Sequence, residues 1–177
     1  MAFIEVVTRC YKRPEMLKIN TASLDRQTFK DWEQTLLIDE VGQGMTWANA
    51  QLASFEPEGE YVWILDDDDV AVRSTLFGEV AEIIKREDAD MVMVKMDHAQ
   101  RGILPNPWGA EPIVGRIGSS AAFIRREIWN QCKDAWLIPA YTADGEFMRR
   151  CFWASDCVWW HNVVGSKVQR ISLGEPA

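Results

Sequence analysis

The sequence GEYVWILDDDDV, at residues 59–70, joins an apolar run directly to four consecutive aspartates. An unbroken apolar run over 61–65 predicts a short strand that is buried on both faces, as strands of parallel sheets are. The strand then ends at Asp66, so the acidic run Asp66 to Asp69 lies at one edge of the predicted sheet. The other predicted strands and their polar ends are compared below with this strand end.

The segments on either side alternate between strands and helices. We predict strands over 3–7, 32–38, 61–65, 91–96, 119–124 and 157–160. We predict helices that begin at Pro14 and over 47–55, 74–85 and 142–153, with a Gly- and Pro-rich loop over 97–112. This alternation is typical of an α/β domain with a mostly parallel central sheet flanked by helices.

Composition narrows the class of protein. Hydrophobic residues make up 47% of the 177-residue chain, which is enough for the core of one domain. We find no apolar run of the roughly 20 residues that span a bilayer, and no secretory signal, so we expect a cytoplasmic protein without a membrane partner. The four cysteines form no CxxC pair, and we interpret them as reduced, packed thiols.

The formal net charge of −8 disfavours nucleic acid as a partner, because such binding needs a basic surface. Part of that charge is concentrated in the four aspartates. At an effective dielectric constant near 20, two like charges a few ångströms apart cost about 4 kcal/mol. A divalent cation is one compensation, since Mg²⁺ is held by carboxylates together with substrate phosphates. The alternatives are a solvated acidic turn, or a role for Asp69 at a helix start.

Polar groups also follow the other predicted strands. Thr8 and Arg9 follow the first strand, and Asp39 follows the second. Ligands of open α/β sheets bind at the carboxyl ends of the strands, so we predict a binding site where these groups meet the acidic run. His98 follows the strand over 91–96, and we interpret it as an ordinary loop residue.

Four segments resemble the family two glycosyltransferases, which have the GT-A fold, and the first three lie in that family's order and at about its spacing. They are VVTRCYKRPEML at 6–17, QTFKDWEQTLLIDE at 27–40, GEYVWILDDDDV at 59–70 and TADGEFMRRCF at 142–152. The chain is similar to a small, minimal version of such an enzyme. The resemblance implies one domain over 1–177, with a nucleotide-binding half over about 1–97 and an acceptor half with a C-terminal lid over about 98–177.

The resemblance also implies roles for individual residues. Those expected to contact the nucleotide or its diphosphate are Thr8, Arg9, Asp39, Asp66, Asp67, Arg73, Lys167 and Arg170. Asp39 would face the base and Asp66 the ribose, and Lys167 or Arg170 would meet the diphosphate from the lid. Those expected to hold Mn²⁺ or Mg²⁺ are Asp68, Asp69 and His161, with the register inside the aspartate run open by one residue.

Two positions depart from the family's pattern. Ala48 stands where a helical arginine or lysine usually touches the nucleotide; Arg73, Lys12 and Arg13 are candidates to replace that cation. Ala143 stands where the later acidic motif usually has glutamate. The resemblance implies Asp144 as the base that deprotonates the acceptor hydroxyl, with Glu146 as the second candidate; the alternative is that both only favour a helix N-terminus.

The function that the resemblance implies is transfer of a sugar, with inversion, from a nucleoside diphosphate donor such as a UDP-sugar to an acceptor hydroxyl. Two other interpretations remain open. One is a sugar nucleotidyltransferase, disfavoured because the loop after the first strand has no glycine; the other is a non-catalytic nucleotide-sugar-binding module. Because the family usually has more chain for acceptor binding, the resemblance implies a small or exposed acceptor, or a site that depends on the partner of a homodimer. Trp108, Trp159 and Trp160 are candidates to border that acceptor.

Overall fold

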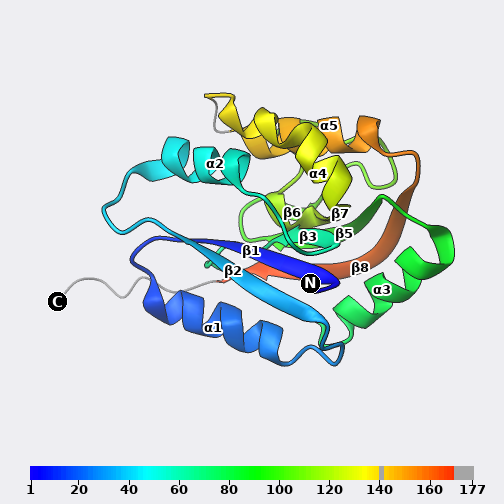
Figure 1. Cartoon of the computed structure of the whole chain (residues 1–177), viewed down its shortest axis with the longest axis horizontal. Helices are drawn as coiled ribbons and strands as arrows, with labels where there is room; N and C mark the ends of the chain where they lie inside the picture. The colour runs from blue at the N-terminus through cyan, green and yellow to red at the C-terminus, as the bar shows by residue number, and fades with distance from the viewer. Residues whose placement is uncertain (140–141, 170–177) are drawn as a thin grey trace.

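A computed structural model describes residues 1–139 and 142–169 (Figure 1). The strands are β1 (Ile4–Cys10), β2 (Trp32–Ile38), β3 (Tyr61–Ile64), β4 (Asp69–Ala71), β5 (Met91–His98), β6 (Gly102–Leu104), β7 (Ala122–Arg125) and β8 (Val158–Val168). The α-helices are α1 (Pro14–Asp25), α2 (Gly44–Ser54), α3 (Leu76–Glu87), α4 (Arg126–Cys132) and α5 (Ala143–Ala154). Short 3₁₀ helices, η1 (Ser119–Ala121) and η2 (Lys133–Leu137), precede β7 and follow α4.

The sheet is mixed rather than mostly parallel, which corrects the sequence-based expectation. Its strand order is β2-β1-β3-β7-β5-β8-β4, with β6 paired to β5. Strands β1, β2 and β3 are parallel, as are β5 and β8, while β7 runs antiparallel between β3 and β5. β3 and β5 therefore run in the same direction. As a result, the carboxyl ends of β1, β2, β3 and β5 open at one edge of the sheet.

Helices cover both faces of this sheet. Figure 1 shows α1 and α3 on one side and α2, α4 and α5 on the other. β3 supplies both cores by alternation, as expected of a strand buried on both faces: Val62 and Ile64 join the core beneath α2, α4 and α5, and Trp63 joins the core beneath α1 and α3. The acidic run thus follows a strand that is buried along its whole length.

The predicted elements are confirmed with shifted ends, and short strands were missed. The segment over 97–112, expected to be a loop, contributes the end of β5 and all of β6. The strand expected over 157–160 extends to Val168 as β8, and β4 forms inside the stretch after the acidic run. All four cysteines are free thiols. None of the helices in the described part of the chain has the length and hydrophobicity to cross a membrane.

Trp63 connects the core to the edge that carries the acidic run. Its ring stacks on Phe123 at 4.8 Å and meets Phe77 edge-on at 5.6 Å between centroids. Its indole Nε1 donates to the Ser120 carbonyl at 2.9 Å, which ties η1 to β3.

We expect Trp63→Ala to lower the free energy of unfolding by about 3–5 kcal/mol, because it leaves a cavity between the two aromatic rings. Chemical denaturation measures this loss. Trp153→Ala is the matched control, since that side chain is 58% exposed; it should cost about 1 kcal/mol or less. Equal losses in the two variants would contradict this account of the core.

Candidate functional site

A cleft of about 420 Å³ lies at the edge where the parallel strands end. That volume falls within the range of sites for small ligands. Its polar and aromatic lining residues are Arg9, Tyr11, Arg13, Asp39, Trp47, Asn49, Asp66, Asp68, Asp69, His98, Arg101, Ser119, Trp136 and Asp144. Residues far apart in sequence therefore meet at the edge that the strand-end argument predicts.

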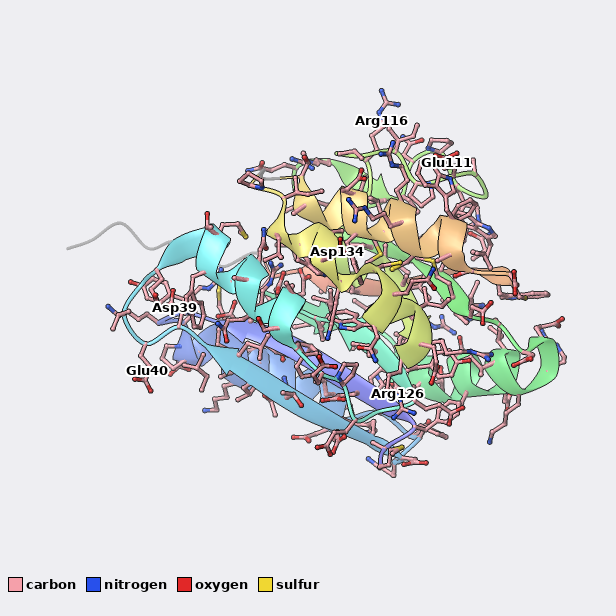
Figure 2. The ribbon with its side chains drawn as sticks, turned by 45° about the horizontal axis from the view of Figure 1, so that its top comes forward. Asp39, Glu40, Glu111, Arg116, Arg126 and Asp134 are labelled. Atoms are coloured by element: carbon pink, nitrogen blue, oxygen red, sulfur yellow. The ribbon has the colours of Figure 1, made fainter. Side chains whose placement is uncertain are left out.

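Asp39 organises the turn from β2 into α2. Its carboxylate accepts four backbone N–H groups, from residues 41 to 44, at 2.6 to 3.3 Å. Gly42 and Gly44 take left-handed φ angles of 86° and 80°, which bend the chain around this carboxylate. Burial opposes the charged form, but the four N–H groups outweigh it and lower the pKa of Asp39. Figure 2 shows Asp39 and Glu40 together at this turn.

Arg9 and Asp66 form a two-pronged ion pair on the floor of the cleft. Arg9 Nε and Nη2 donate to the two Asp66 carboxylate oxygens at 2.7 and 2.6 Å, and both side chains are largely buried. Arg9 Nη1 donates to Asn49 Oδ1 at 3.0 Å. The Arg9 guanidinium, which comes from β1, thus reaches α2 next to Ala48. Ala48 is the position at which the resembled family usually has a basic residue.

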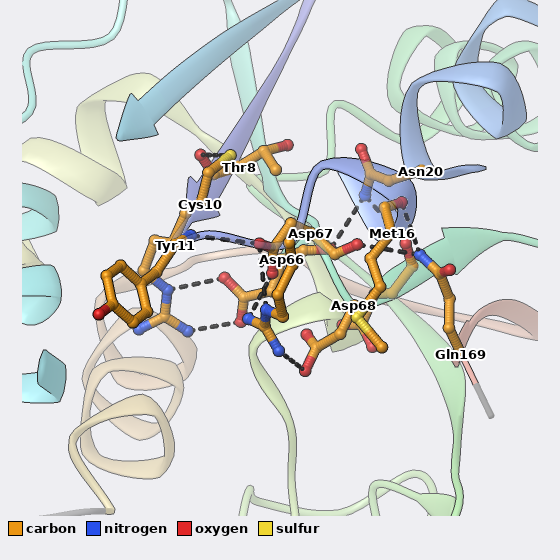
Figure 3. A network of polar contacts seen from close by, with 12 residues as sticks. Thr8, Cys10, Tyr11, Met16, Asn20, Asp66, Asp67, Asp68 and Gln169 are labelled. Carbon is orange, nitrogen blue, oxygen red and sulfur yellow. Dashed lines mark hydrogen bonds and ion pairs between the residues drawn. The ribbon is translucent and has the colours of Figure 1, made fainter. Parts of the chain in front are cut away.

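Arg13 neutralises the next two aspartates. It pairs with Asp67, which is fully buried, and its Nη1 donates to Asp68 Oδ2 at 2.7 Å (Figure 3). The Tyr11 N–H also donates to Asp67, at 3.3 Å. Burial still raises the pKa of Asp67 despite these partners. Arg13 and Asp68 remain partly exposed, at 42% and 35% of their side-chain surface, so this pair faces the solvent side of the cleft.

The backbone of the acidic run is held from behind. Asn20 Nδ2, on α1, donates to the carbonyls of Asp66 and Asp69 at 2.9 Å each. Gln169 also binds this backbone: its backbone N–H donates to the Asp68 carbonyl and its Nε2 donates to the Asp67 carbonyl (Figure 3). The Asp69 side chain is 3% exposed, and burial holds its pKa well above its usual range.

Asp144 faces the cleft from the first turn of α5. Its Oδ1 accepts the Gly145 N–H at 2.7 Å. Burial raises the pKa of Asp144. Glu146 does not line the cleft; it pairs with Arg149 and Arg150 on the same helix, at 2.7 and 3.4 Å.

Several predicted site residues lie elsewhere. Thr8 is buried beneath the cleft, where its hydroxyl accepts from Gln34 Nε2 at 2.9 Å. His161, on β8, contacts Glu79 of α3, with its Nε2 at 2.8 Å from Glu79 Oε2. Arg73 pairs with the same glutamate at 2.7 Å. The structure therefore does not bring His161 or Arg73 to the acidic run.

The predicted lid and acceptor border are also placed differently. Lys167 is exposed in β8, paired in register with Val70 of β4, and Arg170 lies outside the described residues. Trp108 and Trp160 pack edge to face at 4.9 Å against the core. The tryptophans that line the cleft are instead Trp47 and Trp136.

The chain's own carboxylates fit a cation at one position. In the described part of the chain, no three His, Cys, Asp or Glu side chains are grouped to hold a metal. Both Asp66 oxygens are engaged by Arg9, and Asp67 and Asp69 are buried. Asp68 remains, partly exposed and facing the cleft. One carboxylate together with ligand phosphates is a donor set typical of Mg²⁺, so the site fits a cation that arrives with a diphosphate.

Sequence reasoning missed His98, which lines the cleft at the end of β5. The rule that ligands bind at the carboxyl ends of parallel strands was sufficient to find it, because His98 follows a predicted strand. Trp136 had no such signal, since it comes from η2 and its place depends on how α4 and α5 pack.

No protein-family model matches the sequence, and no curated protein sequence matches it significantly. Solved structures share its fold. The 1–349 fragment of S. aureus TarS has a TM-score of 0.74 at 15% identity, over 96% of this chain and 60% of that one. The same fragment in complex with UDP-GlcNAc gives 0.74 at 14% identity, over 99% and 60%.

A second protein, A197 from STIV, has a TM-score of 0.55 at 18% identity, over 100% of this chain and 98% of that one. At these identities the likeness shows the fold alone. The α/β fold expected from the sequence is confirmed as a mixed-sheet fold shared with the TarS fragment, and the chain spans 60% of that fragment.

The Arg9–Asp66 pair generates a stability prediction. Arg9→Met should lower the free energy of unfolding by about 3–5 kcal/mol, because it leaves the Asp66 charge largely buried without a partner. Adding Asp66→Asn should recover part of that loss, as a double-mutant cycle by chemical denaturation measures. Arg86→Met, which removes an exposed pair with Glu87, is the control and should cost about 1 kcal/mol or less. A loss in Arg9→Met no larger than in this control would refute the assigned role.

Proposed function

We propose that this chain is a glycosyltransferase that moves a sugar, with inversion, from a UDP-sugar to an acceptor hydroxyl with the help of Mn²⁺ or Mg²⁺. The observation that carries the proposal is the cleft, in which Asp39, Asp66, Asp68 and Asp144 converge from three separate segments of the chain. The shared fold supports it, because TarS was crystallised with UDP-GlcNAc and with UDP.

The β1–β2–β3 end of the cleft suits the nucleoside. Asp39 is held rigid and charged by its four backbone donors, and it would accept the N–H of a base edge in exchange for the longest of these contacts, from the Gly44 N–H at 3.3 Å. Asp66 is fixed in orientation by the Arg9 fork, which leaves it an acceptor for ribose hydroxyls. Trp47 supplies an aromatic wall at the same end.

The diphosphate belongs at the exposed Arg13–Asp68 pair. A cation on Asp68 would stabilise the negative charge of the departing diphosphate. Arg13 contacts Asp68 through Nη1, so binding at Asp68 frees that donor for a phosphate oxygen, and the pair exchanges partners without leaving either charge unpaired. Arg13, one of the candidates for the missing helical cation, is therefore the diphosphate ligand in this proposal.

Asp144 is placed to act as the base. It faces the cleft from α5, and its raised pKa makes it a better proton acceptor than an ordinary aspartate. In an inverting transfer it takes the proton of the acceptor hydroxyl as that oxygen attacks the anomeric carbon, while the bond to the diphosphate breaks. Glu146, the second candidate, suits this role less well, because it is not among the residues that line the cleft and it pairs with two arginines.

Titration calorimetry tests the binding step. We expect UDP to bind, and Mn²⁺ to increase its affinity at least about tenfold. Asp68→Asn should remove that increase, whereas Asp156→Asn, an exposed aspartate before β8, should behave as the wild type. The function is disproved if UDP and UDP-sugars fail to bind with and without Mn²⁺ in a chain that is folded.

The pH dependence of turnover tests Asp144. The base works as a carboxylate, and burial raises its pKa, so activity should fall as the pH drops through that raised value, above the range of an ordinary aspartate. Asp144→Asn should lower turnover by about 10²- to 10⁴-fold and abolish this acid limb. Glu146→Gln, on the same helix, should keep both the rate and the limb; a normal profile in Asp144→Asn would exclude Asp144 as the base.

A further inference from the structure

The turn that follows His98 determines which nitrogen of its imidazole ring accepts hydrogen bonds. It is the last residue of β5 and leads into the tight hairpin to β6, where Gly102 takes a left-handed φ of 72°. Its Nδ1 lies 3.2 Å from both the Gln100 and the Arg101 backbone nitrogens. Backbone N–H groups only donate, so Nδ1 is the acceptor and the proton of the neutral ring is on Nε2.

This tautomer limits what the ring can do. Because Nδ1 is turned to the hairpin, Nε2–H is the edge left for the cleft, which His98 lines. The ring presents a donor there; a metal ligand or a base would need a lone pair on Nε2. A single neutral donor matches the oxygen of a neutral hydroxyl. Arg101, the charged residue of the same hairpin, also lines the cleft, and its Nη1 donates to the Gly115 carbonyl at 3.3 Å. The Arg13–Asp68 pair proposed for the diphosphate lies at the acidic run that follows β3.

The position of His98 separates it from the nucleoside end. Asp39 follows β2 and His98 ends β5, which are four places apart in the sheet. At about 4.8 Å per strand, that is roughly 19 Å across the cleft. Asp144, the base of the proposed reaction, faces the same cleft, and the acidic run lies between the two ends. A ligand with its base at Asp39 and its phosphates at Asp68 therefore extends its sugar toward His98.

We infer that His98 Nε2–H donates a hydrogen bond to a hydroxyl oxygen of the sugar carried by the nucleotide donor, and so positions that sugar for transfer. This inference rests on the proposed function. It makes His98 a positioning residue for the sugar that contributes nothing to binding of UDP itself.

Two substitutions separate this role from the role of His98 in its own turn. In His98→Asn, the side-chain oxygen can replace Nδ1 as acceptor for the turn, but no donor reaches the place of Nε2. In His98→Gln, the longer amide can place an N–H near the former Nε2, while the turn loses its acceptor. His98→Asn should bind UDP as the wild type does and bind the matching UDP-sugar about three- to tenfold more weakly. His98→Gln should recover most of that loss. The reverse order, with only His98→Gln impaired, would show a purely structural role.

Nitrogen-15 NMR gives a readout that is independent of activity. The chain has two histidines, so the His98→Asn spectrum assigns the His98 signals. Nδ1 should appear unprotonated and Nε2 as N–H. UDP should leave the Nε2 signal in place, and one of UDP-GlcNAc, UDP-glucose and UDP-galactose should shift it.

UDP binding without any sugar-dependent shift, or a proton found on Nδ1, would overturn this inference and leave the proposed function standing. Failure of UDP and all three sugar nucleotides to bind would remove both.

Discussion

The structure depends on neutralising four adjacent carboxyl groups at the end of a buried strand. β3 cannot move outward to hydrate them, because its residues serve the cores on both faces of the sheet. The chain solves this with two arginines of the β1–α1 segment and with burial. Arg9 takes Asp66, Arg13 takes Asp67 and Asp68, and Asp69 is held where its neutral form is favoured. The most exposed of these contacts, Arg13 with Asp68, is the one that a ligand can exchange at least cost.

Much of the surrounding architecture holds this arrangement in place. Asn20 from α1 and Gln169 after β8 fix the carbonyls of the acidic run, so the first helix and the last strand of the described chain meet there. β7 enters antiparallel between β3 and β5 and brings Ser119 to Asp66 at 3.3 Å. The mixed sheet thus completes the cleft: its antiparallel strand delivers the segment that closes the floor beside the parallel strand ends.

The sequence predicted the parts of this site that follow from local pattern. The apolar run before Asp66 identified β3, and the strand-end rule located Arg9, Asp39 and the acidic run at one edge. The sequence did not predict which residues neutralise the aspartates. Arg9 and Arg13 pair with residues more than 50 positions away, and such pairing depends on tertiary packing. The same dependence on tertiary packing explains His161, which the family resemblance implied as a metal ligand but which β8 places against Glu79. It also explains β4 and β6, three-residue strands that form only against β8 and β5.

A crystal structure grown with UDP and Mn²⁺ tests the central claim, which is the exchange of partners at the Arg13–Asp68 pair. The account predicts a cation on the Asp68 carboxylate, the diphosphate between that cation and Arg13, and the uracil beside Asp39. It also predicts that the buried Arg9–Asp66 fork stays intact. A nucleotide bound outside this cleft, or one bound within it while Arg13 remains on Asp68 and no cation is present, would contradict the account.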